Sequence, residues 1–274
     1  ERRLRGLPAM LARAVREWRI FCRYASELDV RHGVAMYFDY LLTVPLALGW
    51  RAPCKISGVF FRPMIHYERF AYPGADADEV LHRLRGRAVL RRALRHPDLD
   101  TIFTLDPYLP DYAREVFGTE RVVHLVDPVR IPSDVDERAC RLIERFGLDD
   151  GRRRMLLFGV LSARKGVHQV IEAARMLQRE TAERVSILVI GWQPPAQRPV
   201  VDGAVERALR EGGPRIVVQP ESVPEEDVQA WFALSDAVLT PYQHHIGMAS
   251  IVLRAAASGV PVIADRYGLL GEMT

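Results

Sequence analysis

Residues 241–265, P-Y-Q-H-H-I-G-M-A-S-I-V-L-R-A-A-A-S-G-V-P-V-I-A-D, predict the end of a strand, a loop, a helix and a second strand in succession. Ser250 has the side chain of a helix cap, and Gly259 suits the left-handed position that follows a helix. Pro261 prevents further helix, and the apolar run after it predicts a strand. This order indicates one unit of a doubly wound α/β sheet, with the start of the helix facing the loop.

The start of this predicted helix has the properties of an anion site. The backbone amides of Met248, Ala249 and Ser250 have no carbonyl partner within a helix that begins here, and Gly247 lets the backbone approach a ligand closely. The helix dipole adds a partial positive charge at the same end. Phosphate is the ligand that we expect.

A second loop, G-V-L-S-A-R-K-G at residues 159–166, follows a predicted buried strand and precedes a predicted helix. Lys165 stands at the helix entrance, where its charge would lie beside unpaired amides. A Lys-Gly pair at a helix start is about as often simply solvated as it is functional. The spacing between this loop and residues 241–265 favours the functional alternative.

The two stretches resemble the donor-site segments of the retaining glycosyltransferases of the GT-B fold, family four, also described as glycosyl transferases group 1. The family pattern P-[SY]-x(n)-E-G-F-G-x-x-x-x-E-A-x-A-x-G-x-P-V-[IV]-A matches well at residues 253–264. The loop resembles the family's G-R-L-x-x-x-K-G, with Lys165 in the place of the lysine, Val160 in that of the arginine and Arg164 as a neighbouring substitute. The resemblance implies donor-binding roles for Gly159, Arg164, Lys165, Gly247, Met248, Ala249, Ser250 and Arg254.

Both donor-site glutamates of the family are missing from this chain. Ile246 occupies the position of the glutamate that contacts the donor sugar, and Arg254 that of the glutamate that holds the ribose hydroxyls. An arginine can only donate hydrogen bonds, so the ribose contact of the family cannot form. Arg254 either reaches a phosphate of the ligand, or points to solvent or pairs with a nearby acid.

The resemblance covers residues 101–274 well and the earlier part loosely, and it implies an α/β, GT-B-like fold in which two Rossmann-like, doubly wound domains face a cleft. Residues 127–132, D-P-V-R-I-P, break all periodicity and predict a linker. We expect an acceptor-side domain at residues 1–129 and a nucleotide-sugar donor domain at residues 130–274. Both domains are expected to be truncated, because the family's glycine-rich acceptor-side loop and final helices are not recognisable, and the fragment alone is expected to be inactive.

His66 is the candidate catalytic residue. It follows a predicted strand at residues 55–61, and loops beyond the carboxyl ends of parallel strands form the ligand crevice of an open sheet. Its imidazole would act as a general base or polarise a donor phosphate. The alternative is a loop histidine that makes a structural hydrogen bond. Residues 34–48, earlier in the chain, predict a largely buried helix.

Composition excludes several classes of protein. A formal charge of +3 without a repeated basic and aromatic pattern argues against nucleic-acid binding. The three cysteines Cys22, Cys54 and Cys140 lack close pair spacing, which fits reduced thiols and a cytoplasmic location. We expect neither a metal nor a cofactor. Residues 7–28 predict a basic amphipathic helix, which either makes a peripheral contact with the inner face of the membrane or presents a solvated face.

By resemblance, the expected reaction is the transfer of a sugar from a nucleotide-sugar to a hydroxyl of a carbohydrate or lipid-linked acceptor, with retention of configuration and with the donor phosphate oxygens assisting. The missing glutamates support a second hypothesis, a non-catalytic nucleotide-binding or scaffold protein on the same fold. A third is another enzyme on this architecture, such as an epimerase, but the carboxylates and histidines of that class are not recognisable here.

Overall fold

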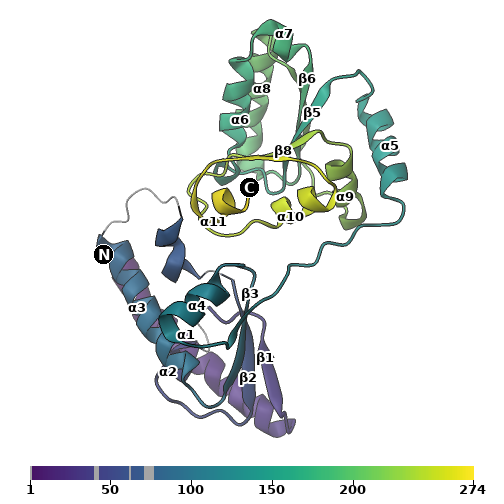
Figure 1. Cartoon of the computed structure of the whole chain (residues 1–274). Helices are drawn as coiled ribbons and strands as arrows, with labels where there is room; N and C mark the ends of the chain where they lie inside the picture. Colours follow the sequence, from purple (N-terminus) through teal and green to yellow (C-terminus); the bar gives the residue numbers. More distant parts are fainter. Residues whose placement is uncertain (1, 40–42, 62, 71–76) are drawn as a thin grey trace. The chain divides into compact units, whose positions relative to one another are not determined.

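The computed structural model describes residues 2–39, 43–61, 63–70 and 77–274 (Figure 1). The chain divides into two compact units, Glu1–Val126 and Asp127–Thr274. Each unit contains one parallel β-sheet. In the part of the chain that the structure describes, no helix combines the length and the apolar composition needed to cross a membrane.

The amino-terminal unit contains a four-stranded parallel sheet of order β1-β2-β3-β4. Its apolar core is formed largely by side chains of the sheet and of the helices packed on it, among them Trp18, Phe38, Leu46, Ile56 and Leu90. The elements are α1 (Arg2–Glu27), β1 (His32–Ala35), α2 (Thr43–Ala47), β2 (Lys55–Phe60), η1 (Met64–Arg69), α3 (Ala77–Leu94), β3 (Leu99–Thr104), α4 (Leu109–Phe117) and β4 (Val122–His124).

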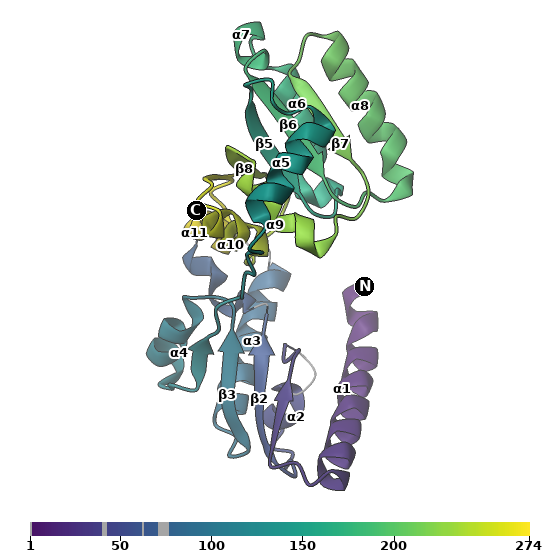
Figure 2. The same cartoon turned by 90° about the vertical axis from the view of Figure 1, so that its right-hand side faces the viewer.

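The helix predicted at residues 7–28 is confirmed as α1, which lies beside β1 (Figure 2). The contact is close, because a Cβ at Gly33 would lie 2.7 Å from the Phe21 ring. The helix predicted at residues 34–48 is wrong in its first part. Val34 belongs to β1 and pairs with Ser57 of β2, and helix is described only at Thr43–Ala47, while residues 40–42 lie outside the described residues. Pairing with β2 determines the conformation of the first part of this segment and overrides its local helical pattern.

The carboxyl-terminal unit contains a five-stranded parallel sheet of order β7-β6-β5-β8-β9. The predicted α/β fold with parallel sheets is confirmed. The elements are α5 (Val135–Phe146), β5 (Arg153–Phe158), η2 (Ala163–Lys165), α6 (Val167–Arg175), α7 (Arg179–Ala182), β6 (Val185–Ile190), η3 (Pro195–Gln197), α8 (Arg198–Arg210), β7 (Arg215–Gln219), α9 (Glu225–Ala233), β8 (Ala237–Thr240), α10 (Ser250–Ala257), β9 (Val262–Ala264) and α11 (Gly268–Met273).

Helices cover both faces of this second sheet (Figure 1). On one face α5, α9 and α10 bury Trp231 and Phe232 against the strands, and on the other α6 and α8 bury Ile171 and Val201. A sheet that is buried on both faces holds its strands in fixed register. The loops at the carboxyl ends of its strands are therefore presented from a rigid base.

Candidate functional site

The strand order of the carboxyl-terminal unit reverses between β5 and β8. After β5 the chain adds β6 and β7 on one side of it, and then returns to place β8 and β9 on the other side. In open parallel sheets, ligands bind outside the carboxyl ends of the strands at such a reversal. The loops that leave β5 and β8, residues 159–166 and 241–249, are the two predicted donor-site stretches, and they flank this point.

These two loops are in direct contact. The amide of Gln243 donates to the carbonyl of Arg164 at 2.8 Å. Gly166 has a φ of +76°, and a Cβ there would lie 2.2 Å from the carbonyl oxygen of Pro241. Only glycine allows this approach, so the structure brings the end of the first loop against the start of the second.

Lys165 lies at the centre of the contact. Its ammonium Nζ donates to the Tyr242 hydroxyl at 2.5 Å and lies 4.0 Å from the centre of that ring. On another side is Gly159, with a φ of +120°, where a Cβ would lie 3.4 Å from Nζ. Burial, with a smaller contribution from the positive charge of Arg164, lowers the pKa of Lys165 to about 8.

Arg164 is exposed and is linked to the second loop through His245. Its Nη1 lies 3.4 Å from His245 Nδ1, while His245 Nε2 lies 3.1 Å from the carbonyl oxygen of Met248. A carbonyl can only accept, so Nε2 carries the proton and Nδ1 is the acceptor that faces the guanidinium. The His245 ring also meets Tyr242 edge on, with centroids 5.5 Å apart.

The sequence alone predicted no role for Tyr242 or His245, although both stand in the stretch P-Y-Q-H-H at residues 241–245. One signal for them was present in the sequence. Two ring side chains stand between the end of a predicted strand and the start of the helix that is predicted to bind an anion. Their contacts with Lys165 and Arg164 depend on β5 and β8 being neighbours, which the local pattern does not show.

Helix α10 begins at Ser250, one residue earlier than the sequence predicted. Ala249 is the cap, in extended conformation, and no side chain bonds the amides at this end. Ser250 is the first helical residue, so the predicted capping role of Ser250 is wrong. The first-turn amides therefore remain without a side-chain partner and, together with Gly247 and Met248, form the backbone portion of the candidate anion site.

Arg254 is directed at an acid. Its Nη2 donates to Glu225 Oε1 at 2.8 Å, and the two side chains are 22% and 78% exposed. Its carbonyl oxygen accepts a hydrogen bond from the Gln229 amide at 2.9 Å. Arg254 thus ties α10 to α9. The sequence left open whether Arg254 reaches a phosphate or instead points to solvent or pairs with a nearby acid, and the structure shows the pairing with an acid.

His66 lies in η1, just beyond the carboxyl end of β2, and its ring is buried. Nε2 lies 2.7 Å from Asp106 Oδ2, and both side chains are only 1% exposed. The rings of Tyr67, Phe70 and Tyr112 surround the imidazole. This placement joins η1 to the segment after β3 and favours the structural alternative, because a ring so deeply buried presents no nitrogen to an acceptor hydroxyl.

Two further residues, Trp192 and Gln193, lie just beyond the carboxyl end of β6. The Trp192 side chain is 44% exposed, and its carbonyl accepts the Leu161 amide at 2.8 Å, which joins this corner to the β5 loop. Gln193 is fully buried, and neither its Nε2 nor its Oε1 has a hydrogen-bond partner among the described residues. A buried amide without partners is destabilising, so a water or a ligand group is expected beside it.

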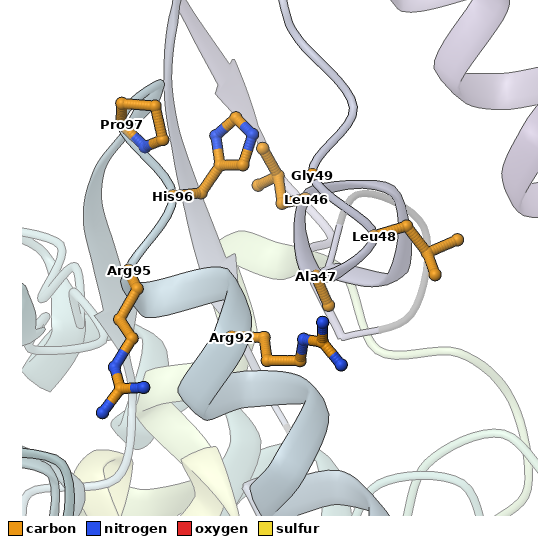
Figure 3. Close-up of a pocket in the computed structure, with 8 residues that line it drawn as sticks. All are labelled: Leu46, Ala47, Leu48, Gly49, Arg92, Arg95, His96 and Pro97. Atoms are coloured by element: carbon orange, nitrogen blue, oxygen red, sulfur yellow. The ribbon is translucent and has the colours of Figure 1, made fainter.

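A separate pocket lies on the amino-terminal unit (Figure 3). Figure 3 shows Arg92 and Arg95 at the carboxyl end of α3, where their charges complement the helix dipole. The His96 ring beside them accepts the amide of Asp98 at Nδ1, at 3.1 Å. These are structural roles. Among the described residues, no group of three or more His, Cys, Asp or Glu side chains is arranged to hold a metal ion.

Comparison with known proteins finds similarity to a family and to a group of solved structures. Residues 152–274 match the family described as Glycosyl transferases group 1. The chain is also 30% identical over 192 residues to a GDP-mannose-dependent alpha-(1-6)-phosphatidylinositol monomannoside mannosyltransferase of Mycolicibacterium smegmatis, covering 66% of this chain and 48% of that protein. The chain thus spans about half the length of this curated relative. Both matches support the family that the two loops resemble.

Solved structures match the fold. A sucrose-phosphate synthase of Thermosynechococcus elongatus has a TM-score of 0.62 at 16% identity, covering 92% of this chain and 60% of that chain. A UDP-forming alpha,alpha-trehalose-phosphate synthase of Burkholderia xenovorans has a TM-score of 0.62 at 15% identity, covering 94% and 64%. The Anabaena protein HepE, in complex with UDP, has a TM-score of 0.60 at 16% identity, covering 93% and 64%. The α/β fold is that of GT-B glycosyltransferase structures.

Proposed function

We propose that the carboxyl-terminal unit binds the diphosphate of a nucleotide-sugar, and that the protein transfers the sugar to an acceptor hydroxyl with retention of configuration. The observation that carries this proposal is the contact between the two loops at the strand-order reversal. It places Lys165 and Arg164 beside the loop that leads into the uncapped start of α10. A doubly negative diphosphate is the ligand that suits two cations and a helix N-terminus.

In this proposal the chain's own groups stabilise the charge of the leaving diphosphate. The Lys165 ammonium and the first amides of α10 act on the phosphate oxygens, whose charge grows as the bond to the sugar breaks. A phosphate oxygen of the donor then accepts the proton of the incoming hydroxyl, on the same face of the sugar. Because cationic groups and backbone amides supply the neutralisation, we propose that neither a metal nor a cofactor takes part.

For the acceptor we propose a carbohydrate or a lipid-linked sugar, used in the cytoplasm at the inner face of the membrane. The amino-terminal unit has 20 Lys and Arg against 15 Asp and Glu in residues 1–126. On α1, Ile20 and Tyr24 are about half exposed, and Arg16 and Arg23 are exposed near them. Exposed apolar rings and chains among arginines are the composition of a helix that lies on anionic lipid.

One observation favours a second candidate, a non-catalytic nucleotide-binding or scaffold protein. Ile246 and Arg254 stand where the resembled family has glutamates, and Arg254 is engaged by Glu225. No carboxylate is therefore placed at these two positions to bind the sugar or the ribose.

Calorimetric titration of the protein with nucleoside diphosphates and nucleotide-sugars, followed by an assay of sugar transfer to lipid-linked acceptors, tests the proposal. We expect binding that Lys165→Met weakens by about tenfold or more, because a charge-assisted hydrogen bond is lost. The matched control is Lys55→Met, whose ammonium donates to the Pro97 carbonyl in the other unit. Sugar transfer would exclude the non-catalytic scaffold, whereas no binding by the unmodified protein would refute the donor site.

A further inference from the structure

The chain is almost without lysine. Of its 38 basic residues only two, Lys55 and Lys165, are lysines, and all others are arginines. Lys55 is exposed and donates to a backbone carbonyl, a role that an arginine also performs. Lys165 instead occupies the contact between two loops at the candidate anion site. The use of a lysine at this one position requires an explanation in terms of its surroundings.

The surroundings of the Lys165 ammonium suit a lysine and not an arginine. Nζ is held between Gly159, where even a Cβ would approach to 3.4 Å, and Tyr242, whose hydroxyl and ring face it at 2.5 Å and 4.0 Å. We call the space between Gly159 and Tyr242 the seat of the amine. It offers the compact ammonium group one oxygen acceptor and one aromatic face. A guanidinium is larger and planar and needs acceptors in a fork, which the seat does not supply.

Tyr242 is itself held rigidly. It is 4% exposed and packs in a small apolar cluster with Ala249, Val252 and Leu270. This cluster includes the cap and the first turn of α10. The side chain that fixes the amine is therefore packed against the backbone that forms the rest of the anion site.

We propose that Tyr242 is a positioning residue: its hydroxyl and ring hold the Lys165 amine in a seat that fits only a lysine, and aim it at a phosphate bound before α10. The proposal rests on the proposed function for the identity of the ligand. The seat itself rests on the contacts of Lys165 and Tyr242 and is tested separately below.

The seat has a consequence for proton binding. Burial and the charge of Arg164 place the pKa of Lys165 at about 8. The ring of Tyr242, which also contacts the amine, is uncharged. His245 lies next to both, in edge contact with Tyr242 and 3.4 Å from Arg164. A diphosphate brings negative charge to the amine and raises its pKa, so binding near pH 8 takes up part of a proton. An arginine would bind the same anion without proton uptake.

Nuclear magnetic resonance of the protein labelled with ¹³C and ¹⁵N at lysine tests the seat without any ligand, because the chain contributes two lysine signals. We expect Tyr242→Phe, which keeps the ring and removes the acceptor, to lower the titration midpoint of Lys165 by about one pH unit. The Lys55 signal is the internal control and keeps its midpoint. An unchanged Lys165 midpoint in Tyr242→Phe would mean that Tyr242 is only a packing residue, and would overturn the proposal.

Calorimetry with UDP and GDP near pH 8, in two buffers of different ionisation enthalpy, tests whether the Lys165 amine contacts the bound phosphate. We expect uptake of about half a proton per diphosphate in the unmodified protein and none in Lys165→Met. Binding without proton uptake would overturn the proposal that Lys165 contacts the phosphate. No binding at all would refute the proposed function, while the lysine titration would still decide whether Tyr242 positions the amine.

Discussion

The guanidinium of Arg254 donates to Glu225 at 2.8 Å and so ties α10 to the first turn of α9. Both helices begin at the carboxyl edge of the sheet, the edge at which the candidate anion site lies. Because the arginine is engaged by an acid, it is not available to a phosphate in this conformation. The ion pair therefore accounts for Arg254 as a link between helices and leaves the proposed phosphate contact to Lys165 and Arg164.

We predict that Arg254→Ala leaves the affinity for UDP and GDP within about twofold of the unmodified protein and lowers the free energy of unfolding by at most about 1 kcal/mol, as for a partly exposed ion pair. Titration at low and high salt, with Glu225→Gln as the matched control, measures both effects. Weaker binding with a flatter salt dependence in Arg254→Ala alone would show that the guanidinium leaves Glu225 and reaches the phosphate.

The fold was predictable from residue 101 onwards because its signals are local. Apolar runs bounded by glycine and proline mark strands and helices of the carboxyl-terminal unit, as in residues 241–265, where the end of β8, α10 and β9 follow one another in the predicted order. The segment at residues 34–48 was not predictable, because β1 is only four residues long and exists through its pairing with β2. Local propensity cannot report a partner strand that is distant in the sequence.

The same distinction applies to the site. The lysine loop and the start of α10 could be found because glycine spacing and helix caps are local features. The seat of Lys165 could not, because Tyr242 is 77 residues away and meets the lysine only when β5 and β8 are neighbours. The environment of His66 likewise depends on Asp106, which is 40 residues further on.

A glycine pair tests the contact between the two loops. We predict that Gly166→Ala lowers the free energy of unfolding by about 2–4 kcal/mol, because the added Cβ meets the Pro241 carbonyl in addition to the strain of a positive φ. The matched control is Gly259→Ala, with a φ of +67° and nothing within 4 Å of the added Cβ. It should cost only about 1 kcal/mol, the strain alone. Equal losses in urea unfolding would mean that the loops separate without penalty.

The buried pair in the amino-terminal unit separates a structural role from a donor-binding role. We predict that His66→Ala lowers the free energy of unfolding by about 3 kcal/mol or more, because Asp106 is left buried without its partner. The affinity for UDP should not change, since the anion site lies in the other unit. Urea unfolding and titration calorimetry measure the two effects. Loss of UDP affinity in a folded His66→Ala protein would restore the donor-contacting role that the sequence suggested.

The lowered pKa of Lys165 leads us to predict that the stability of the fold depends on pH. Folding lowers the pKa of this amine from an ordinary value of 10.5 to about 8, so between these values the unfolded chain binds more protons than the folded one. Stability due to this group therefore rises as the pH increases from about 8 to about 10.5. Below pH 8 the charged amine is destabilising, by up to about 3 kcal/mol for a shift of this size.

We accordingly predict that Lys165→Met is more stable than the unmodified protein at neutral pH and that its advantage disappears as the pH rises through this window. Methionine keeps the length and apolar character of the side chain without the charge. Urea unfolding on both sides of the window measures the difference, with Lys55→Met as the control for general effects of lysine removal. Parallel stability curves for Lys165→Met and the unmodified protein would show that the amine titrates normally. They would also remove the physical basis for proton uptake on diphosphate binding, because that uptake requires a partly deprotonated amine in the free site.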